Sequence, residues 1–184
     1  MEVNMVLSDS DSKLFYELWL PLLDYVNDSQ HINDLRDIAH ADSLNPQKVK
    51  EIANTIWEDA SLIDDYLKSC SEKLSEEEKA ILSSWKKCRS GRFIMERHLK
   101  KGSIFISDDN KVYLVSGIIT SWQEMFWFAK LPLMVDMTII PFKNVLITDG
   151  LCIPYQISFG PGIRSMLKET YMDAKNAKMI ITHF

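Results

Sequence analysis

Two glycines, a proline and an arginine share one short segment, residues 160–164 (Gly-Pro-Gly-Ile-Arg), at the start of an expected amphipathic helix. Free backbone N–H groups at the start of a helix attract anions, and Arg164 and Lys168 add positive charge. The segment therefore predicts a site for a phosphate or carboxylate, formed by Gly160, Gly162, Arg164 and Lys168. A plain strand-to-helix turn is the preferred interpretation, because the segment matches neither a dinucleotide-binding fingerprint nor a Walker loop.

Large apolar side chains are concentrated in the segment 122–134. They are Trp122, Met125, Phe126, Trp127, Phe128, Leu131, Leu133 and Met134. A short helix buries one stripe of side chains, which Trp122, Met125 and Phe126 would form, so that Trp127 or Phe128 points elsewhere. Exposed large aromatic residues are typical of binding surfaces. We interpret Trp122, Trp127 and Phe128 as a candidate interaction surface, with core packing beneath a loop as the alternative.

The strongest cluster of positive charge spans residues 86–101 and is interrupted by one acidic residue, Glu96. Its members are Lys86, Lys87, Arg89, Arg92, Arg97, Lys100 and Lys101. A patch of this kind can contact nucleic acid or an acidic protein. The preferred interpretation is that the patch is solvated or faces acidic helices of the same chain, because its members span a helix end, a turn and two strand ends.

Residues 35–58 place small and apolar residues with the spacing of a helix-turn-helix, in which Asn45 and Pro46 start the second helix. Two positions disagree with the motif: Ser43 stands where the turn usually has glycine, and Asp42 occupies a normally apolar position. The surrounding half of the chain is also acidic, and DNA phosphates repel acidic surfaces. An ordinary helical hairpin is therefore the preferred interpretation.

Residue patterns for catalysis or metal binding are absent from the sequence. No Gly-x-Ser-x-Gly elbow, Cys-x-x-Cys pair or His-Glu-x-x-His motif occurs. Asp136 and Asp149 could form a carboxylate pair across a sheet, as acid–base chemistry requires, but Asp149-Gly150 is also typical of a turn. We name no catalytic residue, metal site or cofactor, and favour a binding protein over an enzyme.

The composition is that of a globular protein, with 46% hydrophobic and 26% charged residues in a chain of 184. The three scattered cysteines indicate a reducing compartment. The sequence starts without the pattern of a secretory signal, and charge or proline interrupts each apolar stretch before it reaches the length of a membrane span. We therefore expect a cytoplasmic protein without membrane association.

Up to Gly91 the apolar residues recur with helical periodicity. A first helix is predicted after the capping residues Asp9 and Ser10, and Pro21 should kink or split it. A shorter helical segment follows at 32–39.

Two further helices begin at clear capping signals. Asn45 and Pro46 supply a cap and a first-turn proline for one long helix that runs to Leu67. Ser75, followed by three glutamates, forms a capping box that opens another helix toward Arg89.

From Arg92 onward, alternation of apolar and polar residues replaces the helical period. Strands are predicted at about 93–99, 103–107, 112–119, 133–142 and 144–148. Ser121 caps a short aromatic helix between the third and fourth strands. The final helix begins at Gly160, and residues 179–182 form a last strand.

These elements predict an α+β fold: an N-terminal helical segment packed on a C-terminal curled antiparallel sheet, or on a small SH3-like barrel, with a terminal helix. The expected regions are 1–90, acidic and helical, and 91–184, antiparallel β with the C-terminal helix, together forming one compact unit. The first region has 10 Lys and Arg against 18 Asp and Glu, a net −8, whereas the second has 11 against 8, a net +3.

Five short segments of the second half are distinctive. They are Arg97-His98-Leu99-Lys100-Lys101, Trp122-Gln123-Glu124-Met125, Pro141-Phe142-Lys143, Asp149-Gly150-Leu151 and Phe159-Gly160-Pro161-Gly162-Ile163-Arg164. They resemble a pattern shared by an uncharacterised bacterial protein family, and the helical part is similar at 18–25 and 63–67. The resemblance implies a bacterial source, but it carries over no site, because the family has no established activity.

Together the patterns predict a cytoplasmic protein-interaction or binding module without catalysis, which binds an unidentified protein or forms a homo-oligomer. One alternative is a nucleic-acid-binding protein that uses residues 86–101 or the helix-turn-helix-like segment 35–58. The other is an enzyme or binder of a small anionic ligand at the 160–164 turn.

Overall fold

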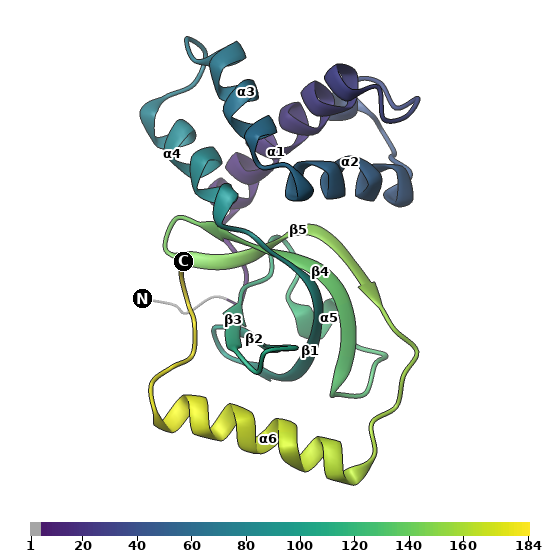
Figure 1. Cartoon of the computed structure of the whole chain (residues 1–184), viewed down its shortest axis with the longest axis vertical. Helices are drawn as coiled ribbons and strands as arrows, with labels where there is room; N and C mark the ends of the chain where they lie inside the picture. Colours follow the sequence, from purple (N-terminus) through teal and green to yellow (C-terminus); the bar gives the residue numbers. More distant parts are fainter. Residues whose placement is uncertain (1–4) are drawn as a thin grey trace. The chain divides into compact units, whose positions relative to one another are not determined.

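The computed structural model describes residues 5–184 and contains helices and a five-stranded sheet, which confirms the predicted α+β class. The chain divides into two compact units (Figure 1), a helical unit of residues 10–88 and a sheet unit of residues 5–9 with 89–184. This division falls within three residues of the change in period at Gly91. One compact unit was expected, and two are observed.

Helix α1 (Asp9–Gln30) runs through Pro21 without splitting, so of the kink or split that we predicted, the split is absent. Proline removes one helical hydrogen bond. Buried residues lie on both sides of it, Leu18 and Trp19 before and Leu22 and Leu23 after. We attribute the continuity of the helix to this packing, which holds both halves on one core.

The predicted long helix from Pro46 to Leu67 is wrong, because the structure has two helices there, α2 (Pro46–Glu58) and α3 (Ser61–Cys70). The predicted cap is present, since Asn45 Oδ1 accepts hydrogen bonds from the backbone N–H groups of the second and third residues of α2. The break lies at Asp59, whose Oδ1 accepts from Ser61 N at 3.1 Å and Ser61 Oγ at 2.6 Å. A short polar side chain that binds nearby backbone competes with helix continuation.

Residues 31–45 are largely irregular, so the short helix predicted at 32–39 is also wrong. Only one turn of 3₁₀ helix, η1 (Ile38–His40), is present there. The Asp24 carboxylate accepts from Ile38 N at 2.7 Å and Ala39 N at 3.1 Å, which holds this turn against α1. A helix-turn-helix needs a full helix before the turn, and the structure places none in residues 31–45.

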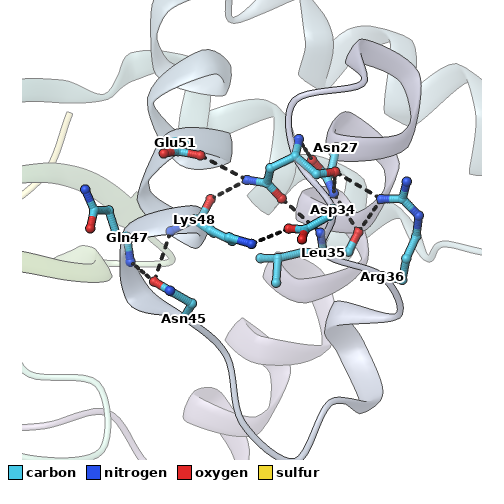
Figure 2. A network of polar contacts seen from close by, with 9 residues as sticks. Asn27, Asp34, Leu35, Arg36, Asn45, Gln47, Lys48 and Glu51 are labelled. Carbon is cyan, nitrogen blue, oxygen red and sulfur yellow. Dashed lines mark hydrogen bonds and ion pairs between the residues drawn. The ribbon is translucent and has the colours of Figure 1, made fainter.

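A polar network fixes the irregular segment between α1 and α2 (Figure 2). Asn27 is buried, donates to Leu35 O at 2.9 Å and accepts from Asn33 N at 3.0 Å. Lys48 of α2 pairs with Asp34. Buried amides that satisfy nearby backbone groups are structural, so we assign this network to the fold.

The helical unit ends with α4 (Glu76–Ser84) and the 3₁₀ turn η2 (Trp85–Lys87). The predicted capping box is present, since Ser75 N donates to Glu78 Oε2 at 2.7 Å and Ser75 Oγ accepts from Glu78 N at 3.3 Å. Trp85 is fully buried and packs against the rings of Phe15 and Trp19 of α1.

Five strands form the sheet unit. They are β1 (Arg89–Leu99), β2 (Gly102–Ser107), β3 (Val112–Val115), β4 (Leu133–Phe142) and β5 (Val145–Pro154). The strand order is β1-β2-β3-β5-β4, and β4 also pairs with β1. The link between β3 and β5 is one parallel pair, Val115 with Leu146, so the sheet is mixed rather than wholly antiparallel. It is a curled sheet joined by this single pair, not a barrel with continuous hydrogen bonding on all sides.

Strand alternation places one set of side chains inside the curl, where Phe93, Met95, Phe105 and Val135 are buried. The other face of β2 and β3 is covered by α6 (Pro161–Asn176), whose Leu167 and Tyr171 pack with the β2 and β3 core. Figure 1 shows α6 running along one side of the strands. The last predicted strand is reduced to one parallel bridge between Tyr113 and Ile181.

Candidate interaction surface

A capping box fixes α5 (Trp122–Met125), the short helix between β3 and β4. Ser121 Oγ accepts from Glu124 N at 3.2 Å, as expected of a capping serine, and Glu124 Oε2 accepts from Ser121 N at 3.1 Å. Ser121 Oγ also donates to Glu124 Oε2 at 2.6 Å. Ser121 was predicted as a cap, whereas the role of Glu124 was not predicted.

Two aromatic residues anchor α5 in the core of the sheet unit. Trp122 and Phe126 are buried, and their rings stack with centroids 6.2 Å apart. Trp122 also contacts the ring of Phe105 in β2 at 4.9 Å. Trp122 therefore belongs to the core, which removes it from the predicted interaction surface.

The two residues that follow this anchor are turned to solvent. Trp127 is 81% exposed and Phe128 is 64% exposed, and their rings make an edge contact at 6.1 Å. Met125, expected in the buried stripe, is 41% exposed. Met125 is the last residue of α5, and the buried stripe consists of Trp122 and Phe126 alone. We call Met125, Trp127 and Phe128 the aromatic surface.

A groove of about 470 Å³ lies beside Trp127. Its lining residues are Met5, Val6, Ser121, Gln123, Glu124 and Trp127. The segment that carries Met5 and Val6 is held by Gly117, since Gly117 N donates to Met5 O at 2.9 Å and Leu7 N donates to Gly117 O at 3.1 Å. The groove is therefore formed by a backbone-paired segment on one side and α5 on the other.

The Glu124 carboxylate gives this groove a negative charge. Hydrogen bonds from the Ser121 side chain and backbone lower the pKa of Glu124, because they favour the ionised form. The residue is exposed to solvent and is the one charged residue among the described residues that line the groove.

Three members of the predicted basic patch, Lys86, Arg89 and Arg97, form ion pairs with acidic residues. Lys86 pairs with Asp64 at 2.6 Å. Arg89 pairs with both Asp108 and Asp109, at 3.2 and 3.1 Å. These pairs agree with the interpretation of the charge run as internally paired rather than free for a ligand.

Arg97 pairs with Glu96 and lies 4.0 Å from the ring centroid of Tyr171, a residue of α6. Lys87, Arg92, Lys100 and Lys101 are exposed. Their role as a binding patch stays a prediction.

The 160–164 turn starts α6, as the sequence indicated, with Gly160 at the N-cap. Neither glycine requires its special conformational freedom: both lack a positive φ, and a Cβ at Gly160 or Gly162 would meet nothing within 4 Å. Arg164 Nε donates to Phe159 O at 2.9 Å, and both Arg164 and Lys168 are exposed. This geometry suits a strand-to-helix turn, and anion binding stays a prediction.

Asp149 is buried within β5, where the register between β4 and β5 shifts, and its carboxylate binds neighbouring residues of the same strand. Its Oδ1 accepts from Leu151 N at 3.0 Å and from Thr148 Oγ1 at 3.2 Å, next to Gly150 with φ of 87°. Asp136 is opposite Ile153 in the sheet register. Asp149-Gly150 therefore lies inside a strand, at an irregularity of the β4–β5 register, and not in the turn that the sequence indicated.

Comparisons with protein-family models, with curated proteins and with solved structures find no match for this chain. The predicted family resemblance therefore stays a prediction. Within residues 5–184 no group of three or more His, Cys, Asp and Glu side chains could hold a metal ion, and no helix there is long and apolar enough to cross a membrane.

Proposed function

We propose that this chain is a protein-interaction module that binds its partner through the aromatic surface. The observation that carries the proposal is the 81% exposure of Trp127 on a segment whose neighbours Trp122 and Phe126 are buried. Clusters of exposed large apolar residues are typical of interaction sites, and tryptophan is enriched among the residues that dominate binding energy.

Burial of the Trp127 and Phe128 side chains against a partner would stabilise the complex, because it removes their apolar surface from water. Full burial of a large apolar side chain is worth about 1.5–3 kcal/mol, which applies to both Trp127 and Phe128. The capping box and the buried rings hold the segment in place before binding. This pre-organisation lowers the entropy cost of association.

The geometry favours a protein over a nucleic acid as the partner. Exposed aromatic rings can stack on single-stranded bases, but such sites combine the rings with a positively charged groove. The charged residue in the groove beside Trp127 is an acid, Glu124. A phosphate backbone would be repelled there.

Substitution of the aromatic surface tests the proposal. A partner would first be recovered by crosslinking and co-purification, and its affinity for purified chains then measured by calorimetry. Trp127→Ala and Phe128→Ala should each weaken binding by about tenfold or more, because both remove ring area from the contact. Each variant should unfold at the same urea concentration as the wild type, since both side chains are already exposed.

Met166→Ala is the matched control, because Met166 is an exposed apolar residue on α6 with 53% exposure. It should leave the affinity unchanged. If Trp127→Ala and Phe128→Ala bind as tightly as this control, the aromatic surface is not the binding site.

A further inference from the structure

We infer that the groove beside Trp127 receives a basic side chain, arginine or lysine, from an extended segment of the partner protein. This inference rests on the proposed binding at the aromatic surface and adds the chemistry of the partner. Three features of the groove support it: an ionised carboxylate, an aromatic ring and an apolar wall, all among its lining residues.

The carboxylate of Glu124 is held in position with part of its hydrogen-bonding capacity unused. Oε2 accepts from the backbone and side chain of Ser121. Among residues 5–184, Oε1 has no hydrogen-bond partner. Each carboxylate oxygen accepts hydrogen bonds from a guanidinium or ammonium group, so Glu124 can bind a cation without breaking the capping box.

Trp127 supplies the second element of cation recognition. A positive charge over the face of an indole ring is attracted by the negative potential of that face, and tryptophan is the strongest of the aromatic residues in this respect. Because Trp127 and Glu124 line one groove, a single basic side chain can reach both.

The wall of Met5 and Val6 suits the aliphatic part of the same side chain. Both residues are half-buried and apolar. Lysine and arginine carry three or four methylene-sized groups before the charge, and they commonly lie along apolar surface with the charged end in water. A short acidic side chain would place like charge beside Glu124 and leave this wall uncovered.

A phage-displayed library of random short peptides tests the inference without a known partner. The immobilised full chain selects peptides, and those that also bind Trp127→Ala are removed. The remaining Trp127-dependent peptides should be enriched in arginine and lysine relative to the unselected library.

The variant Glu124→Gln then measures how much the negative charge of Glu124 contributes to peptide binding. Glutamine at this position keeps the capping box, because it can still accept from the Ser121 N–H, so the variant should unfold like the wild type. The best synthetic peptide should bind it about threefold more weakly, as expected for one exposed charge pair. Gln123→Glu adds an acid to the same groove and should strengthen binding.

A peptide in which glutamine replaces the basic residue should not distinguish wild type from Glu124→Gln, which shows that the two charges act on each other. Trp127-dependent peptides without basic enrichment, or equal affinity for wild type and Glu124→Gln, would overturn the inference and leave the proposed function standing. Failure to select any Trp127-dependent peptide would count against both.

Discussion

At the scale of single residues, the chemistry of a position depends on what surrounds it. Gly102 is the first residue of β2, and Gly162 belongs to the predicted anion site. In the structure Gly102 has a φ of 142°, and a Cβ there would lie 2.4 Å from Val115 O. Gly162 has open space around it. Sequence spacing cannot distinguish these two glycines, because the close approach comes from a neighbouring strand.

This contrast predicts opposite effects for the same substitution. Gly102→Ala should lower the free energy of unfolding by about 2–4 kcal/mol, since it combines backbone strain with a clash against backbone that cannot move aside easily. Gly162→Ala, within the first turn of α6, should raise it by up to about 1 kcal/mol. Urea denaturation of the two variants and the wild type measures both, and equal stability of the two would contradict the geometry described for Gly102.

At the scale of elements, three of the capping signals located helix starts correctly, whereas Asp9 and Ser10, predicted as caps, lie inside the first turn of α1. Ser75, Ser121 and Asn45 were predicted to start helices, and each caps one. The failures lie where a side chain interrupts a continuous apolar period. Asp59 ends α2 although the apolar stripe continues into α3, because its carboxylate binds the start of the next helix. Residues 31–45 form hydrogen bonds to the side chains of Asn27 and Asp24 in α1 in place of a regular helix.

The cap of α2 gives an element-scale prediction. Asn45→Ala removes the acceptor for the N–H groups of Gln47 and Lys48 and should lower the free energy of unfolding by about 1 kcal/mol. Asn54→Ala, at an exposed position of the same helix, is the control and should change it by less than about 0.5 kcal/mol. Thermal or urea unfolding decides, and an equal effect of both variants would mean that the cap contributes no stability.

In the candidate surface, too, the sequence pattern did not predict correctly which side chains are buried. The sequence indicated that Trp127 or Phe128 would leave the buried stripe, but it assigned Trp122 both to that stripe and to the interaction surface, and it assigned Met125 to the stripe. Which side chains point outward depends on where α5 ends, and helix boundaries are the least certain part of a sequence pattern. The place of Glu124 in the groove could not be predicted, because the segment of Met5 and Val6 lies beside α5 only in the folded chain.

At the scale of the whole molecule, the class of fold followed from the change of period near Gly91, whereas the strand order did not. The strand β4 was predicted with its observed bounds, Leu133–Phe142. The parallel pairing of β3 with β5 joins residues 31 positions apart, Val115 and Leu146, and only the folded chain brings them together.

The central claim is that the molecule binds its partner at the segment around α5. Hydrogen–deuterium exchange of the full chain, with and without the partner recovered by crosslinking, tests this most directly. If the partner binds there, it should slow amide exchange in residues 119–128 and in the adjoining segment at 5–7, and the exchange rate of α6 should not change. Protection of α6 or of the 160–164 turn, with residues 119–128 exchanging as fast as in the free chain, would contradict it.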